Sequence, residues 1–271
     1  MQIFDSHAHY FDRRFETEVE GGSHAILSAI HPDPVRYIVN VGTSIQSSRR
    51  AIAQAAQYEG MYAAAGIHPE DAHMISDVDA SLAELEELLG DRESRRRDKL
   101  VALGEIGLDY HWQFYGEIPM NKPLQARVFE AQLEMARRHS LPVIIHDREA
   151  HGDCFETVLR YPDITGVFHS YSGSAEMARE LCRRGWFLSF AGPLTFKNAE
   201  RVREAARAVP KDRLLVETDA PYLAPHPMRG KINHSGYLCH TLEVLASIWE
   251  CTPEEAAEIT TGNAKKLFCI V

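Results

Sequence analysis

The sequence lacks the features that mark secreted proteins, membrane-spanning proteins and thiolate metal sites. Its five cysteines are odd in number and far apart, and none belongs to a Cys-x-x-Cys pair, which argues against both a disulfide framework and a thiolate zinc site. The opening segment, Met1–Asp5, has no basic stretch followed by an apolar one, so we expect no signal peptide. No apolar run reaches the roughly 18 residues of a transmembrane helix. We therefore expect a cytoplasmic protein that does not contact membranes.

Positive charge is also scarce. Lysine and arginine number 29 against 39 aspartates and glutamates, which gives a formal net charge of −10. A protein that coats nucleic acid gains its affinity from many phosphate contacts, so this balance disfavours that class. It leaves open an enzyme that holds the end of a strand through a few contacts around a metal ion.

Short apolar or β-branched runs alternate with amphipathic segments along nearly the whole chain. Leu124, Val128 and Met135 lie on one face at helical spacing, which predicts a helix over Pro123–His139. The charge run Arg92–Lys99 is expected to be a solvated loop before a strand. The predicted strands are Gln2–His7, Arg36–Gly42, Met61–His68, Leu100–Glu105, Leu141–His146, Thr165–His169, Trp186–Phe190 and Leu214–Thr218.

Eight strands alternating with helices predict a parallel sheet, either open or closed into a barrel. An open sheet that binds dinucleotides would have a glycine-rich fingerprint after its first strand, and none is present. The length of 271 residues suits a closed barrel. We therefore predict an α/β fold: a (β/α)8 TIM barrel that forms a single domain over residues 1–271. Two C-terminal helical segments, one beginning at Thr252–Glu255 and one at Asn263–Phe268, are expected to pack on it.

Metal-binding side chains stand at the C-terminal ends of five predicted strands. His7 and His9 are two residues apart, so they lie on the same side of an extended chain. Catalytic groups of a parallel barrel gather at the C-terminal ends of its strands, and we therefore expect all of these side chains at one rim. The candidate ligands are His7, His9, Glu105, His146, His169 and Asp219.

Four imidazoles and two carboxylates without a thiolate suit divalent ions such as Zn, Mn, Fe, Co or Ni better than Mg. Six ligands are too many for one catalytic ion that keeps an open position, but they fit two ions if one carboxylate bridges them. We therefore expect two divalent metal ions, from the set Zn, Mn, Mg, Fe, Co or Ni. Such a pair generates hydroxide near neutral pH and holds both attacking and leaving oxygens, which predicts hydrolysis.

Recognisable motifs surround these ligands. They are Asp5–His9, Gly66–Pro69, Gly104–Tyr110, Pro142–His146, Phe168–Gly173, Glu217–Leu223 and the closing segment Ile259–Lys265. Together they resemble the TatD-like metal-dependent hydrolases of the amidohydrolase superfamily, over nearly the whole chain.

The resemblance implies a (β/α)8 barrel with two metal ions, one of them held by His7, His9, Glu105 and Asp219. Glu105 would bridge to a second ion held by His146 and His169. Characterised relatives act as metal-dependent deoxyribonucleases that often trim 3′ ends, and some are implicated in removing D-amino acids from tRNA. The sequence departs from many relatives at Ser170-Tyr171, where they have Cys-Phe. It departs again at Asn233–Ser235, where they have Asn-Glu-Pro, in a loop expected to line the substrate mouth.

Further roles are assigned to individual side chains. Asp219 is the candidate general base that orients and deprotonates the attacking water, and Glu105 is grouped with it as catalytic. His68 ends the third strand and is expected to contact substrate phosphate or support a ligand, or else to be an ordinary packed histidine. Arg148 and Arg229 are candidate phosphate anchors, because guanidinium binds phosphate in a bidentate fork. Tyr110, Trp112 and Tyr222 are candidates for stacking on a terminal base, with barrel-top packing the alternative.

The predicted function is that of a two-metal-dependent hydrolase, a deoxyribonuclease or phosphodiesterase that acts on DNA ends in the manner of a 3′–5′ exonuclease. One alternative is a carboxylic ester, lactone or amide hydrolase of the same architecture, including an aminoacyl-tRNA deacylase, because a two-ion site also polarises a carbonyl group. Another is a non-catalytic metal-binding barrel. We expect as partner a nucleic-acid end or a small ester or phosphodiester substrate, with no obligate protein partner.

Overall fold

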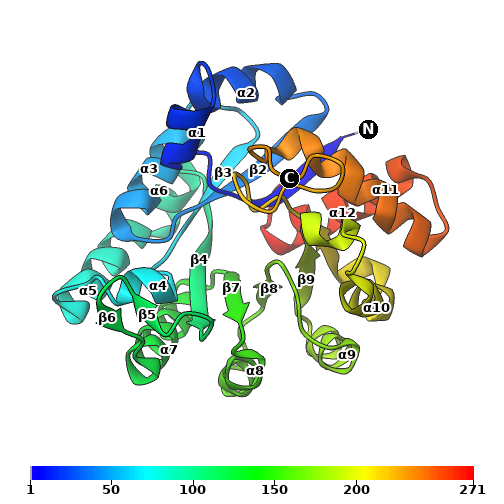
Figure 1. Ribbon diagram of the computed structural model, residues 1–271. Helices are drawn as coiled ribbons and strands as arrows, with labels where there is room; N and C mark the ends of the chain where they lie inside the picture. Colours follow the sequence, from blue (N-terminus) through cyan, green and yellow to red (C-terminus); the bar gives the residue numbers. More distant parts are fainter. Residues whose placement is uncertain (1) are drawn as a thin grey trace.

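Eight parallel strands form the central sheet of the computed structural model, which describes residues 2–271 (Figure 1). Neighbours pair in the order β1-β2-β3-β4-β7-β8-β9-β10, so each strand lies beside the next one along the chain. The prediction of an eight-stranded (β/α)8 barrel is confirmed. The strands are β1 (Ile3–Ala8), β2 (Val35–Val41), β3 (Met61–Ala65), β4 (Leu100–Asp109), β7 (Val143–Arg148), β8 (Gly166–Phe168), β9 (Phe187–Phe190) and β10 (Leu214–Val216).

The barrel closes at a seam between β1 and the residues that follow β10. Ala8 pairs with Ala220 in an isolated parallel bridge, and the His9 amide donates to the Ala220 carbonyl at 2.7 Å. One residue earlier, the Asp219 amide donates to the His7 carbonyl at 2.9 Å. These bonds lie at the C-terminal ends of the strands, and they hold His7, His9 and Asp219 next to one another.

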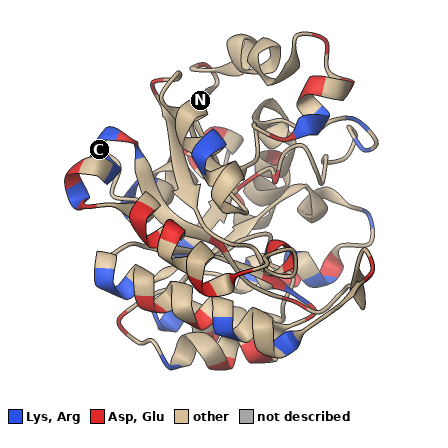
Figure 2. Ribbon diagram, turned by 90° about the vertical axis from the view of Figure 1, so that its left-hand side faces the viewer, with Lys and Arg blue, Asp and Glu red and all other residues tan. Residues whose placement is uncertain are grey.

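Helices surround the sheet (Figure 1). Acidic and basic positions are interspersed along the outer helices on the side shown in Figure 2. Within residues 2–271, none of the helices combines the length and the apolar character that a membrane crossing requires. The helices are α1 (Arg13–Glu18), α2 (Gly22–Ile30), α3 (Ile45–Ala55), α4 (Pro69–Ala72), α5 (Val78–Leu89), α6 (Arg92–Arg97), α7 (Lys122–His139), α8 (His151–Leu159), α9 (Ala175–Arg183), α10 (Glu200–Ala208), α11 (Leu238–Trp249) and α12 (Pro253–Leu267).

The predicted helix over Pro123–His139 is confirmed as α7, whose N-terminus is capped by the Asn121 side chain. Two local predictions were wrong. The charge run expected as a loop is largely helical, because the Asp91 side chain caps α6 and Arg95 donates to carbonyls at the end of α5. The two expected C-terminal segments are one helix, α12, which begins with the Thr252–Glu255 capping box and continues through Asn263.

A short antiparallel hairpin, β5 (Phe114–Tyr115) with β6 (Ile118–Pro119), lies outside the barrel and was not predicted. It follows β4 directly. Its exposed Phe114 lies two residues beyond Trp112, which lines the cavity described below.

One buried cluster contains side chains from all eight barrel strands, which can meet only inside the ring. It includes Phe4 of β1 and Leu215 of β10, and the residues after α12 cover it with Phe268 and Ile270. A second and larger cluster, to which Leu103 and Ile145 belong, fills the space between strands and helices. The barrel is therefore a packed core whose C-terminal rim is left for polar side chains.

Candidate metal centre

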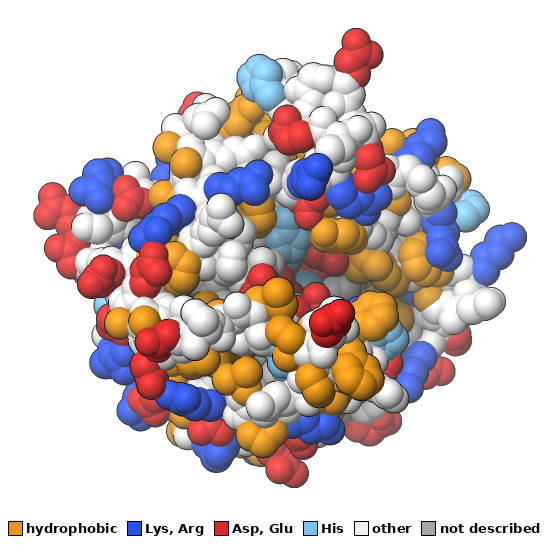
Figure 3. All heavy atoms as spheres, turned by 60° about the vertical axis from the view of Figure 1, so that its left-hand side comes forward, with side chains coloured by type: hydrophobic (Ala, Val, Ile, Leu, Met, Phe, Trp, Pro, Cys, Tyr) orange, Lys and Arg blue, Asp and Glu red, His pale blue; other side chains and the backbone are white. Residues whose placement is uncertain are grey.

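A cavity of about 720 Å³ opens at the C-terminal ends of the strands. Figure 3 shows histidine and acidic side chains at the bottom of a hollow whose rim includes hydrophobic side chains. His9, Glu105, His146, His169 and Asp219 line this cavity directly, and fully buried His7 lies behind them. All six predicted ligands therefore meet at one place, although they come from β1, β4, β7 and the segments after β1, β8 and β10.

The two oxygens of Glu105 face different groups of imidazole nitrogens. Its Oε2 lies 3.3 Å from His7 Nε2 and 3.7 Å from His9 Nε2. Its Oε1 lies 2.8 Å from His146 Nδ1 and 2.7 Å from His169 Nε2. Glu105 is thus the point where two clusters of donor atoms join.

Asp219 belongs to the cluster on the β1 side. Its Oδ1 lies 3.3 Å from His9 Nε2 and 3.8 Å from His7 Nε2, while those two nitrogens are 3.1 Å apart. The backbone of Asp219 is left-handed, with φ of 57°, a conformation that aspartate tolerates better than most residues. Burial would raise the pKa of Asp219, but the hydrogen bond with His9 and the nearby histidine charges hold that pKa below its ordinary value.

His68 lies beside the other cluster, with Nε2 3.5 Å from Glu105 Oε1 and its ring edge-on to His146. Its Nδ1 accepts a hydrogen bond from the Glu70 amide and so caps α4, which fixes the ring orientation. Burial, followed by the charge of His146, lowers the pKa of His68 to about 3. His68 is therefore a neutral imidazole whose Nε2 faces the site.

Three partners behind the cluster orient the imidazoles of the candidate ligands. His146 Nε2 lies 3.0 Å from Asp109 Oδ2, and His169 Nδ1 lies 3.2 Å from Glu217 Oε1. His9 Nδ1 donates to the Val41 carbonyl at 2.6 Å. Sequence reasoning had assigned no role to Asp109 or Glu217, although both belong to motifs that contain ligands. Both carboxylates are fully buried at strand ends, and acidic side chains are seldom buried without a partner, so a strand-end position next to a ligand was the available signal.

A buried carboxylate, Asp5, ties the first ligand strand to the last. It accepts hydrogen bonds from the Thr218 amide at 3.0 Å and hydroxyl at 2.6 Å, and from the Ser235 hydroxyl at 2.6 Å. Burial raises the pKa of Asp5 to about 7, although these hydrogen bonds oppose the rise. Asp5 therefore holds the chain on either side of the seam, and with it the relative positions of His7 and Asp219.

The electrostatics of the cluster suit a divalent cation. Burial would raise the pKa of Glu105, yet the surrounding histidines hold that pKa well below its usual range. Burial would lower the pKa of His146 and His169, but their carboxylate partners raise the first to about 9 and the second well above its ordinary value. The carboxylate field that favours protons on these imidazoles would equally stabilise a metal ion in their place.

The donor set also fits metal binding by its geometry. Three groups of side chains each bring one ligand atom apiece to within 4.8 Å of one another. These groups are His7 with His9 and Glu105, His7 with His169 and Asp219, and His68 with Glu105 and His146. Buried nitrogen and oxygen donors of this kind match the ligand preferences of Zn, Mn, Fe, Co or Ni.

Comparison with known proteins agrees with this chemistry. A family model described as TatD related DNase matches residues 4–269. The chain belongs to the TatD family. It is 40% identical over 271 residues to the uncharacterized metal-dependent hydrolase YabD of Bacillus subtilis, covering 99% of both chains. It is 34% identical over 273 residues to the uncharacterized metal-dependent hydrolase YcfH of Escherichia coli, covering 100% of this chain and 97% of the relative.

The fold agrees as well. The crystal structure of YjjV, a TatD homologue from Escherichia coli, superposes with a TM-score of 0.86 at 29% identity, covering 99% of this chain and 98% of that one. The resemblance inferred from the motifs is confirmed, and this TatD-family chain is a metal-dependent hydrolase.

The mouth of the TatD-family site contains one of the two predicted arginine anchors. Arg148 lines the cavity with its guanidinium 5.4 Å from the Trp112 ring centroid. Arg229 does not line it; the guanidinium instead lies 4.2 Å from the Phe196 ring centroid, in a neighbouring cavity. Arg229 lies ten residues beyond Asp219 in the loop after β10, and this loop brings it to Phe196 rather than to the cluster.

Two of the three predicted stacking residues line the cavity, and the third does not. Trp112 and Tyr222 line the cavity and are 45% and 42% exposed, so both present ring surface to a bound molecule. Tyr110 does not line the cavity. Its hydroxyl donates to Asp153 at 2.8 Å and its ring faces the Lys122 ammonium, which indicates a packing role.

Proposed function

We propose that this TatD-family chain is a two-metal phosphodiesterase that removes nucleotides from the 3′ end of DNA. The supporting observation is that the two oxygens of Glu105 face different histidines. One oxygen faces His7 and His9, and the other faces His146 and His169. A carboxylate placed in this way is suited to bridge two ions.

These distances support one assignment of the ligands. His7, His9 and Asp219, with Glu105 Oε2, would hold one ion, and His146 and His169, with Glu105 Oε1, would hold the other. Two such ions supply a nucleophile at neutral pH and stabilise charge on the attacking and leaving oxygens. Asp109 and Glu217 would keep the imidazoles of His146 and His169 in position, as outer carboxylates do in other metal sites.

The mouth of the site suits a phosphodiester with an attached base. Arg148 supplies N–H donors for a phosphate oxygen, and exposed Trp112 and Tyr222 supply faces on which a base stacks. Arg148 lies beside Trp112 at this mouth, so a guanidinium for a phosphate and a ring for a base are next to each other.

The reaction is a hydrolysis in which the oxygen of water forms a bond to phosphorus and the bond from phosphorus to the 3′ oxygen breaks. One proton of the water passes to ionised Asp219. The leaving 3′ oxygen takes up a proton from solvent water to become a hydroxyl, and Asp219 returns its proton to the solvent. The products are a nucleoside 5′-monophosphate and a strand shorter by one nucleotide. Neutral His68, beside Glu105, is placed to donate a hydrogen bond to a phosphate oxygen.

The test compares three substrates: end-labelled single-stranded DNA, a p-nitrophenyl phosphodiester and an aryl carboxylic ester. Protein is first treated with chelator and then loaded with Zn, Mn, Co, Ni or Mg. We expect stepwise shortening of the DNA, with Asp219→Asn slower by about 10²–10⁴-fold because the proton acceptor is lost. Asp163→Asn, at an exposed position in the loop before β8, is the matched control and should retain full activity.

Two other outcomes would contradict the proposal. Ester cleavage with intact DNA would favour the carboxylic ester hydrolase. Metal retention without turnover of any of the three substrates would favour a non-catalytic barrel.

A further inference from the structure

A second cavity, of about 440 Å³, adjoins the metal-site cavity. Pro193 and Val202 line both, so the two spaces are contiguous over one ridge. We call the second one the Phe196 cavity. Its walls come from the segment after β9, which includes Phe196 and Lys197, and from the loop after β10, which includes His226 and Arg229.

The two cavities differ in charge. The metal-site cavity is lined by seven carboxylates, among them Glu70, Asp71 and Asp147, which repel any phosphate not held by the ions. No aspartate or glutamate lines the Phe196 cavity, whereas Lys197 and Arg229 do. In a chain with a net charge of −10, an uncompensated pair of cations beside the active site marks where an anion is favoured.

The Phe196 cavity also has the chemistry of a stacking site. The Arg229 guanidinium lies over the Phe196 ring at 4.2 Å from its centroid, which forms a cation–aromatic pair. Nucleic-acid bases stack on aromatic rings and on guanidinium planes, and guanidinium and ammonium groups bind the adjoining phosphates. Apolar walls with two cations therefore match one nucleotide unit better than they match a simple anion.

We infer that the Phe196 cavity binds the nucleotide on the 5′ side of the scissile phosphate, with its base on the Phe196–Arg229 pair and a phosphate against Lys197 and Arg229. The inference rests on the proposed function, because it requires a polynucleotide strand in the metal-site cavity. The strand would cross the ridge at Pro193 and Val202 between the two cavities. In this inference Arg229 still binds a phosphate, as the sequence suggested, but in the Phe196 cavity rather than in the metal-site cavity.

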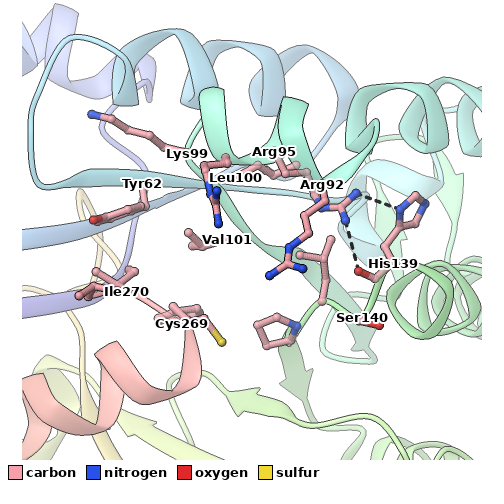
Figure 4. A pocket seen from close by; sticks show the side chains of 15 residues that line it. Tyr62, Arg92, Arg95, Lys99, Leu100, Val101, His139, Ser140, Cys269 and Ile270 are labelled. Atoms are coloured by element: carbon pink, nitrogen blue, oxygen red, sulfur yellow. Dashed lines mark hydrogen bonds between the residues drawn. The ribbon is translucent and has the colours of Figure 1, made fainter.

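A cavity of about 610 Å³ at the opposite end of the barrel also has cationic residues in its lining, but its cations are used differently (Figure 4). Arg95 is directed at His139 and donates to the Gly90 carbonyl at 2.7 Å, and Lys99 donates to the Tyr58 carbonyl at 2.8 Å. These two cations therefore already bind backbone carbonyls in the turns that follow α5 and α3, far from the metal site. Exposed Arg92 of this cavity is therefore a suitable control position.

The test uses the metal-loaded full chain and its variants Arg229→Ala, Arg229→Lys, Phe196→Ala and Arg92→Ala. For a single-stranded oligonucleotide we expect KM to rise about tenfold in Arg229→Ala and Phe196→Ala, a size typical of one lost base stack. For a p-nitrophenyl phosphodiester, which cannot reach across the ridge, kcat/KM should be unchanged. Arg229→Lys should recover only part of the loss, because lysine keeps the charge without the planar face. Arg92→Ala should match the wild type with both substrates.

Binding without turnover gives an independent measure. Anisotropy of a fluorescent oligonucleotide, with chelator present, should show weaker binding for Arg229→Ala and a salt slope shallower by about 0.7, the share of one phosphate contact on single-stranded DNA.

Unchanged oligonucleotide KM in both alanine variants, while the wild type shortens DNA, would overturn this inference alone. Equal losses with the oligonucleotide and the aryl phosphodiester would also overturn it, because they would indicate general damage to the site. A wild type that does not shorten DNA under any metal would overturn the proposed function and this inference with it.

Discussion

At the scale of single residues, the site depends on buried carboxylates. Glu105 joins the two groups of histidines, and Glu217 and Asp109 each hold one ligand imidazole from behind. Glu217 is fully buried and also accepts a hydrogen bond from the Ser189 hydroxyl. The Glu217 carboxylate is therefore fixed by two partners, the Ser189 hydroxyl and the His169 ring, and can hold that ring in one orientation.

We predict that Glu217→Gln weakens metal binding or lowers activity by about 10–100-fold, because the neutral amide is a poorer acceptor for the His169 N–H. Competition for metal with a chromogenic chelator measures the effect. The size of the side chain is conserved, and an unchanged melting temperature would show that the fold is intact. Glu176→Gln, an exposed change on α9, is the control. Wild-type metal affinity in Glu217→Gln would refute the supporting role.

A second prediction at this scale concerns His234, in the loop where the sequence departs from many relatives. Burial lowers the pKa of His234 to about 4, and its ring packs against Tyr237 with centroids 3.8 Å apart. Below pH 6.5 the unfolded chain binds a proton here that the folded chain does not bind until about pH 4. Stability from this group is therefore complete above pH 6.5 and is lost as the pH falls toward 4.

We expect His234→Gln to remove roughly 1–3 kcal/mol of the decline in unfolding free energy between pH 6.5 and 4. Urea denaturation at a series of pH values measures it, with the exposed His226→Gln as the comparison. Parallel pH profiles for wild type and His234→Gln would contradict the prediction.

That the six candidate ligands meet at one rim could be predicted from the sequence, because each lies in or just after the C-terminal half of a strand, and the direction of the strand determines which rim its side chain reaches. Arg229 could not be placed in this way. It lies ten residues beyond Asp219 in a loop without periodicity, so only tertiary contacts with Phe196 decide its position. The partners Asp109 and Glu217 were present in the motifs, but a carboxylate that supports a ligand and one that binds metal have the same local sequence pattern.

At the scale of elements, strands were predicted within a few residues because buried parallel strands are short continuous apolar runs. The largest error is at β4, which extends to Asp109 rather than ending at Glu105. Pairing of Ile106 through Asp109 with β7 extends it, and pairing with a distant strand is not visible in local composition. The helix α6 was missed for a similar reason, since its stability comes from the Asp91 cap and from contacts of Arg95 with α5 and α7.

Helix α12 and the residues after it close the end of the barrel opposite the metal site. Phe268 is buried and stacks on Phe4 of β1 with ring centroids 6.1 Å apart. We predict that Phe268→Ala lowers the free energy of unfolding by about 3–5 kcal/mol, because it opens a cavity in the barrel interior. Urea denaturation measures the loss, and the exposed Val271→Ala should be neutral.

The ligands are at the other end of the strands, so folded Phe268→Ala should keep its metal affinity. Stability within 1 kcal/mol of the wild type would show that these residues do not close the core.

At the scale of the whole molecule, the acidic surface limits how nucleic acid is held. Acidic and basic positions are mixed along the outer helices (Figure 2). The lysines and arginines that line the two cavities are Arg148, Lys197 and Arg229. We predict that the logarithm of affinity for single-stranded DNA falls with the logarithm of salt concentration with a slope of about −2, the value for roughly three phosphate contacts. Anisotropy between 50 and 200 mM salt measures it. A slope steeper than about −5 would indicate a long basic track that the structure does not provide.

The seam between β1 and the residues after β10 has a consequence for the order in which the protein acquires its chemistry. His7 and His9 leave the ribosome some two hundred residues before Thr218, the partner of Asp5, and Asp219. A nascent chain or a fragment that stops before this point has imidazoles but lacks the last carboxylate and the bond that closes the ring. The complete set of candidate ligands is therefore present only after the residues that follow β10 have been made, and a chain that stops earlier lacks Asp219.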